Sequence, residues 1–256
     1  MIIFFVFPIL FNKYFWIISL AGWIGFLESS FNTIIGWMYN YQAACSAGQY
    51  AIITAIAGNA SFWPNLFAPY LIRKFGKKNV LIFSNIMNII FISLMLPVIR
   101  MKGNNLIWVL LIFTFINQLL TSLGHFMNPS LNADIRDYQQ YKSGERIDGM
   151  FATVQTIGNI VTLITSSVLP FVYESYGIYE GNGYETSFDI LDVNTGKPGL
   201  LEDIIGTLII MAAVGAFLNL VPFFFYNLTE KQQKGIVRIL KIRAMFEDYG
   251  NGELEN

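Results

Sequence analysis

Charged residues and cysteines are scarce in this sequence. Only 13% of its 256 residues are charged, against roughly 25% in soluble domains. Because 54% are hydrophobic and the mean hydropathy is +0.50, the chain has too little polar surface to coat a water-soluble globule. An ordinary soluble enzyme is therefore excluded. The single cysteine, Cys45, also excludes an intrachain disulfide and a metal site built from several thiolates.

A strong net charge and a catalytic constellation are missing too. The net charge of −1 provides no basic field for phosphates, so we expect no nucleic-acid partner. The one histidine, His125, has no cysteine, aspartate or second histidine beside it, so we expect no metal site. Neither a nucleophile–base pair nor a phosphate-binding glycine loop is present, which argues against enzymatic activity and a bound cofactor.

Long apolar stretches dominate the sequence instead. Six segments of 20 or more mostly apolar residues could each cross the roughly 30 Å hydrocarbon core as a helix. We therefore predict an all-α membrane protein with six transmembrane helices in residues 14–227. The expected spans are residues 14–39, 50–72, 79–99, 106–128, 148–173 and 204–227. Residues 1–13 are expected to form an interfacial lead-in or the scar of a truncated longer chain, and residues 228–256 a cytoplasmic tail.

The basic residues are concentrated in alternate connections between the expected spans. One side of the membrane receives 13 of the 16 lysines and arginines. Because cytoplasmic connections carry an excess of basic residues, we expect a protein of the cell membrane with both termini in the cytoplasm.

Polar residues recur at helical spacing inside three of the expected spans, which is typical of helices that line an aqueous path. Helix packing through small and hydroxyl side chains is the alternative explanation. The last span carries few polar residues and is expected to face lipid. The residues expected to line a solute path are Trp23, Glu28, Asn32, Asn117, Thr121, Thr156 and Asn159.

Two residues inside the spans have specific consequences. Glu28 is the only charged residue deep in any span, about 2 Å from the expected midplane, where ionising a carboxyl costs several kcal/mol unless water or a partner reaches it. Contact with substrate or a proton and a strut between helices are both open interpretations. Pro64 lacks a backbone N–H and predicts a kink in the second span.

Two cytoplasmic connections resemble motifs of known transporters. Residues 73–78, RKFGKK, are similar to the basic loop between the second and third helices of each half in the major facilitator superfamily. Residues 133–150, ADIRDYQQYKSGERIDGM, resemble the AD-x-x-DY…K-[ST]-G-x-R-x-[DE]-G motif in the carboxyl-terminal half of glycoside-pentoside-hexuronide:cation symporters, the melibiose permease family. The matching residues are Asp134, Asp137, Tyr138, Lys142, Gly144, Arg146 and Gly149.

This resemblance implies one six-helix half of a transporter that moves a sugar together with a coupling cation, Na⁺ or H⁺, by alternating access. It implies a second six-helix half, or a second copy of the chain, as the partner that completes the solute path. The matching motif residues are expected to form a cytoplasmic gate whose ion pairs exchange as the halves move. The alternative is a non-transporting remnant or membrane scaffold with the same fold.

Overall fold

The described part of the chain is almost entirely helical. The computed structural model describes residues 12–31, 34, 46–98, 106–144, 158, 160, 161, 163, 167–178 and 200–251. Within these ranges the elements are α2 (Lys13–Ile24), the 3₁₀ helix η1 (Phe26–Ser30), α4 (Ala47–Asn59), α5 (Phe62–Phe75), α6 (Lys77–Val98), α7 (Leu106–Ser143), α9 (Val168–Ser175), α11 (Leu200–Phe224) and α12 (Glu230–Gly250).

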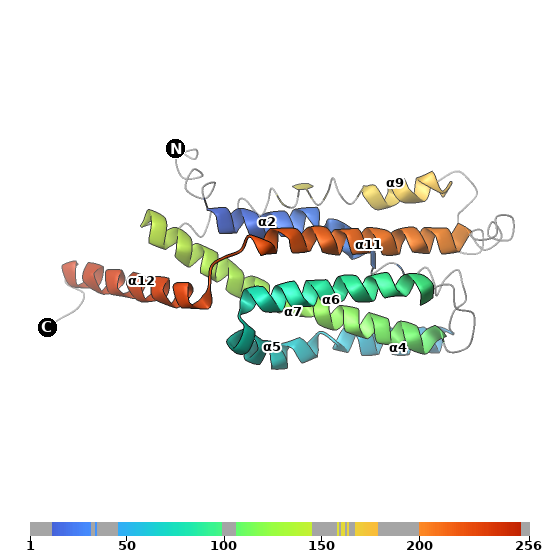
Figure 1. Cartoon of the computed structure of the whole chain (residues 1–256), viewed down its shortest axis with the longest axis horizontal. Coiled ribbons are helices and arrows are strands. Elements are labelled where there is room, and N and C mark those ends of the chain that lie inside the picture. Colours follow the sequence, from blue (N-terminus) through green and yellow to red (C-terminus); the bar gives the residue numbers. More distant parts are fainter. Residues whose placement is uncertain are drawn as a thin grey trace.

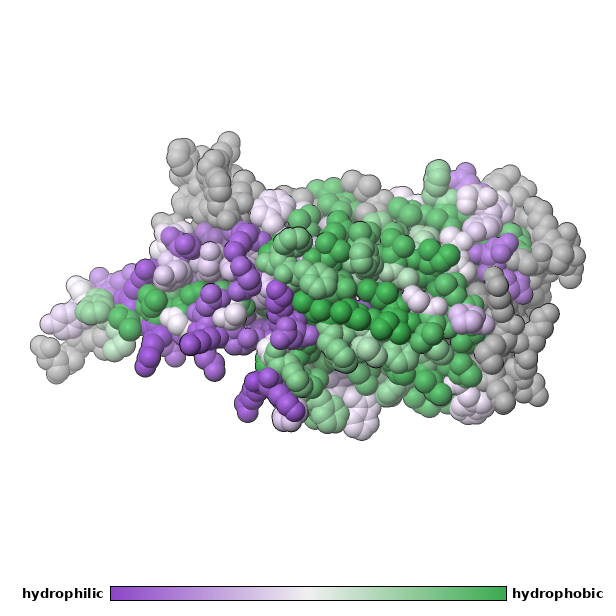
Figure 2. All heavy atoms as spheres, viewed as in Figure 1, coloured by the Kyte–Doolittle hydropathy of each residue, from purple (hydrophilic) through white to green (hydrophobic). Residues whose placement is uncertain are grey.

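The long helices form an elongated bundle in which α2, α4, α6, α7 and α11 run along a common axis (Figure 1). Among the described residues, α6, α7 and α11 are each long and apolar enough to cross a membrane. Apolar side chains cover the middle of the bundle, whereas polar ones gather at the end where α12 projects (Figure 2). These features confirm an all-α membrane fold, while the count of six spans stays a prediction.

The second expected span contains the break that Pro64 predicts. Helix α4 ends at Asn59, and α5 begins at Phe62. Between them the backbone N–H of Ala60 bonds the carbonyl of Ala57 at 3.0 Å, a tight three-residue turn. Proline at position 64 has no N–H to donate to the carbonyl of Ala60, four residues earlier, so the regular helix is interrupted there.

Helix α11 is only partly lipid-facing, contrary to expectation. Its side chains Ile205, Leu208 and Ala212 are fully buried against the rest of the bundle, where α11 packs on α6, η1 and α2. Exposed Ile210 and Phe217 lie on another face and are available to lipid. The apolar composition of α11 therefore serves two purposes, because apolar side chains suit both lipid and the core of a helix bundle.

The start of α2 and the end of α11 meet at the end of the bundle that carries α12. The hydroxyl of Tyr14 and the ammonium of Lys13 donate hydrogen bonds to Asn227 Oδ1, at 2.7 and 3.1 Å. The side-chain amide of Asn12 donates to the carbonyl of Ile135 on α7 at 3.3 Å. We refer to this end, which carries the basic residues of α12, as the charged end.

Candidate functional site

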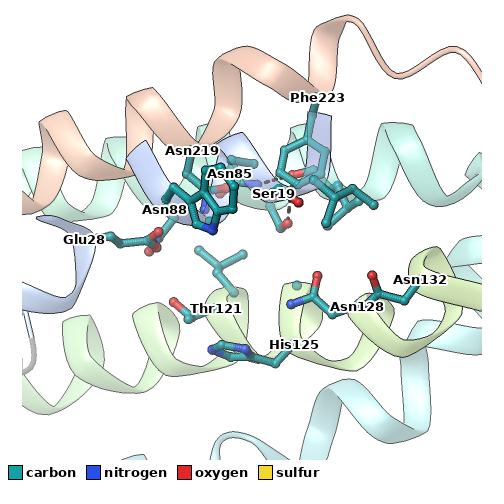
Figure 3. Close-up of a pocket in the computed structure, with 18 of the residues that line it drawn as sticks. Ser19, Glu28, Asn85, Asn88, Thr121, His125, Asn128, Asn132, Asn219 and Phe223 are labelled. Carbon is teal, nitrogen blue, oxygen red and sulfur yellow. Dashed lines mark hydrogen bonds between the residues drawn. The ribbon is translucent and has the colours of Figure 1, made fainter. Parts of the chain in front are cut away.

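A half-open cavity of about 550 Å³, with both polar and apolar side chains in its wall, lies between α2, η1, α6, α7 and α11. This volume is within the usual range for a small-molecule site, roughly 300–1,000 Å³. Glu28 and Asn88 lie together at one end of the cavity, and Asn132 lies at the other (Figure 3). The polar side chains in its wall belong to Ser19, Glu28, Ser84, Asn85, Asn88, Thr121, His125, Asn128, Asn132 and Asn219.

Glu28 reaches the cavity from the 3₁₀ helix η1, where the first expected span departs from a regular α-helix. Helix α2 ends at Ile24, and the N–H of Glu28 then bonds the carbonyl of Gly25 at 3.0 Å. The hydroxyl of Ser30 donates to the carbonyl of Leu208 on α11 at 3.1 Å, which ties η1 to that helix. Close packing of η1 on α11 thus fixes the backbone that carries the carboxyl group.

A chain of hydrogen bonds connects Glu28 to two other helices. The amide nitrogen of Asn88 on α6 donates to Glu28 Oε1 at 2.6 Å, and the amide nitrogen of Asn117 on α7 donates to Asn88 Oδ1 at 2.7 Å. Asn88 and Asn117 are almost fully buried, at 2% and 4% exposure. Buried amides are costly unless they are hydrogen-bonded, so this chain both satisfies them and orients the carboxyl group.

One face of α7 supplies most of the opposite wall of the cavity. Thr121, His125, Asn128 and Asn132 follow at intervals of three or four residues and point into the space between the helices (Figure 3). Pro129 lies inside α7 and has no N–H to donate to the carbonyl of His125. This face therefore offers a backbone acceptor in addition to its amide, hydroxyl and imidazole groups.

The structure brings together part of the predicted solute path. Trp23, Glu28 and Thr121 line the cavity. Asn117 lies behind its wall and is linked to it through Asn88. The remaining predicted path residues Asn32, Thr156 and Asn159 lie outside the described residues.

Three polar residues of α6 that are not among the expected path residues also belong to the site. Ser84, Asn85 and Asn88 all line the cavity, although they lie in a span that is otherwise strongly apolar. Their spacing of one and then three residues places them on one side of a helix. That spacing is the signal that the sequence offers, but three residues cover too little of the span to form a polar stripe along it.

The motif residues at the charged end pair with other segments of the same chain. Lys77 Nζ forms an ion pair with Asp134 Oδ2, and both side chains are largely buried, with 15% and 12% exposure. The amide of Gln233 on α12 donates to Asp137 Oδ2 at 2.9 Å. The ring of Tyr138 meets that of Tyr14 edge to face, with the centroids 4.8 Å apart.

The other motif residues have different surroundings. Lys142 is exposed near the end of α7, and Gly144 directly after the helix has a φ of +80°, a conformation that favours glycine. Arg146 and Gly149 lie outside the described residues. The two acidic motif residues Asp134 and Asp137 thus join α7 to the start of α6 and to α12.

Comparison with known proteins identifies the family. Among curated proteins, no match was found. The family model described as "MFS/sugar transport protein" matches residues 6–230, which is most of the chain and includes every helix that contributes to the cavity. The chain therefore belongs to the MFS/sugar transport protein family, within the major facilitator superfamily.

Proposed function

We propose that this chain forms one wall of the path of a sugar:cation symporter, which works by alternating access in the cell membrane with both termini in the cytoplasm. The observation that carries this proposal is the cavity with its polar side chains, in a bundle whose middle is covered by apolar side chains on the face shown in Figure 2. A second six-helix half, or a second copy of the chain, supplies the other wall. The bilayer covers the exposed apolar side chains of the bundle.

The chemistry of the cavity supports a sugar as solute. Side-chain amides and hydroxyls donate and accept hydrogen bonds, as the hydroxyl groups of a sugar do. Trp23 adds an apolar ring surface to this wall, which can cover the C–H face of a sugar ring. A glycoside, pentoside or hexuronide would thus find both kinds of contact that a sugar needs.

The charged end is proposed to act as the cytoplasmic gate. The residues proposed for this role are those of the matching motif, Asp134, Asp137, Tyr138, Lys142, Gly144 and Arg146. The ion pair of Asp134 with Lys77 supports this role, because charged pairs of this kind can be exchanged when rigid helical units move against one another. The gate would be closed on this side while its pairs are formed and open when they are exchanged.

The test is uptake of radiolabelled glycosides and pentosides into proteoliposomes that contain the chain, with and without an imposed proton or sodium gradient. We expect gradient-dependent accumulation of a glycoside, with equilibrium binding of the same sugar to the purified chain. The function is contradicted if the folded and correctly inserted protein neither transports nor binds any sugar of these classes.

A further inference from the structure

Glu28 is a carboxyl group without a counter-ion of its own in the membrane. None of the six expected spans contains a lysine or an arginine. The hydrogen-bond partner of Glu28 in the cavity is the neutral amide of Asn88. The imidazole of His125 is the other ionisable side chain that the described residues place in the cavity wall, and it forms no ion pair with Glu28. Because an ionised carboxylate at this depth is expensive, a cation that arrives from outside the protein can compensate its charge.

The amide chain is directed toward the carboxyl group. Asn117 donates to Asn88, and Asn88 donates to Glu28. Both amides thus present donors in the direction of Glu28, and the hydrogen bond from Asn88 offsets part of the cost of ionising that group. The second carboxyl oxygen, Oε2, remains available to accept a proton, since the amide bond is made by Oε1.

A proton suits this site better than a metal cation. Metal cations of the hard type require several oxygen ligands, whereas the neighbouring amide oxygen, Asn88 Oδ1, already accepts a hydrogen bond from Asn117 and has one lone pair left. Among the described residues, Glu28 is the one carboxyl group in the cavity wall. A proton needs a single carboxylate oxygen and converts the anion into a neutral acid.

We propose that the carboxyl group of Glu28 is the proton-binding site of this chain, and that Asn88 and Asn117 are positioning residues that connect it to α6 and α7. Its part in transport rests on the proposed function, but the binding of a proton does not. Protonation removes the negative charge from the end of the cavity where Asn88 lies. The solute then enters a neutral site, and the proton and the solute leave together on the other side.

The first experiment measures proton binding directly, without transport. Infrared difference spectra of the purified chain after a pH change should contain the C=O band of a protonated carboxyl group. We expect the part of this band that belongs to Glu28 to be lost in Glu28→Gln, while Glu174→Gln keeps it as a matched control, because Glu174 is exposed on α9 and outside the cavity wall. A band of the same shape and size in Glu28→Gln and in the unchanged protein overturns the proposal. Glu28→Asp, which keeps a carboxyl group, should retain the band and serves if the glutamine variant does not fold.

The second experiment measures coupling in proteoliposomes. Glutamine resembles the neutral, protonated form of glutamate, so the rate at which Glu28→Gln exchanges labelled for unlabelled sugar should no longer depend on pH. In the same variant, the accumulation of sugar that a pH gradient drives should fall at least tenfold, whereas Glu174→Gln should accumulate sugar normally. Undiminished accumulation in Glu28→Gln, or accumulation driven by sodium and not by protons, overturns the proposal. A titrating Glu28 in a chain that carries no sugar would instead refute the proposed function alone.

The positioning residues have a distinct signature. Asn88→Leu removes the amide that donates to the carboxylate, so the pH profile of exchange should move toward alkaline pH. Asn117→Leu should move it in the same direction by less, because Asn117 acts through Asn88. An unchanged pH profile in Asn88→Leu would contradict the positioning role.

Discussion

Replacing Gly215 with alanine is expected to destabilise the protein by roughly 2–3 kcal/mol, the upper range for overpacking a closely packed contact. A Cβ atom at Gly215 on α11 would overlap the backbone nitrogen of Glu28 and approach the carbonyl carbon of Leu27 at 2.6 Å. These atoms belong to the backbone of η1, which cannot turn away as a flexible side chain would. The helix or η1 therefore has to shift, and the carboxyl group of Glu28 shifts with it.

The measurement compares the unfolding temperatures of purified variants in detergent. After heating, size-exclusion chromatography gives the fraction of each variant that remains folded. Gly206→Ala is the matched control on the same helix, because a Cβ atom there meets nothing within 4 Å. It should leave the unfolding temperature unchanged or slightly raised, since alanine favours helix more than glycine does. Equal unfolding temperatures for Gly215→Ala and Gly206→Ala would show that η1 is not held by α11 in this way.

Glu28 shows which features of the site could be predicted from the sequence and which could not. Its charge in an apolar span was enough to select it, because an intramembrane carboxyl group is rare and costly. The change from α2 to a 3₁₀ helix after Ile24 was not predictable, since it depends on close packing against a helix nearly 190 residues later in the chain. Nothing in the sequence around Gly215 indicates that the backbone of η1 packs against this glycine.

The asparagines of α6 illustrate a second limit. Helical spacing places Ser84, Asn85 and Asn88 on one side of a helix, but it does not say whether that side meets lipid, a neighbouring helix or a cavity. The structure resolves this point because Asn88 lies between Glu28 and Asn117. Pairings of polar residues in different spans are tertiary information, so a single sequence identifies the members of such a network more readily than their connections.

Basic and acidic residues at the charged end were recognised from their motifs, but their partners were not. In the sequence, Lys77 and Asp134 lie in two separate expected cytoplasmic connections, each similar to a motif of its own. In the structure these two residues form one ion pair that joins the start of α6 to α7. The expected cytoplasmic gate therefore begins with a contact inside this chain, and breaking that contact is the second change with a large expected effect.

Lys77→Met should destabilise the protein by about 2–4 kcal/mol. The substitution leaves the carboxylate of Asp134 unpaired in a largely buried position, which costs roughly 3–5 kcal/mol when burial is complete. The expected cost is somewhat smaller here because burial is incomplete: the side chains of Lys77 and Asp134 are 15% and 12% exposed. Lys78→Met is the matched control, since Lys78 is linked to the bundle by one exposed hydrogen bond to the carbonyl of Phe224, and it should cost less than about 1 kcal/mol.

The double variant Lys77→Met/Asp134→Leu separates the loss of a favourable pair from the burial of an unpaired charge. If the unpaired carboxylate causes most of the damage, the double variant should be more stable than Lys77→Met, because replacing both members of a buried pair by apolar groups is often nearly neutral. Unfolding in detergent gives the stabilities of these variants.

Transport by the same double variant reports on gating. A gate that depends on the ion pair should open more readily without it, which changes the balance between inward- and outward-facing forms. If the double variant is no more stable than Lys77→Met, the unpaired carboxylate of Asp134 is not the cause of the lost stability. If its transport is unchanged, the ion pair has no role in gating.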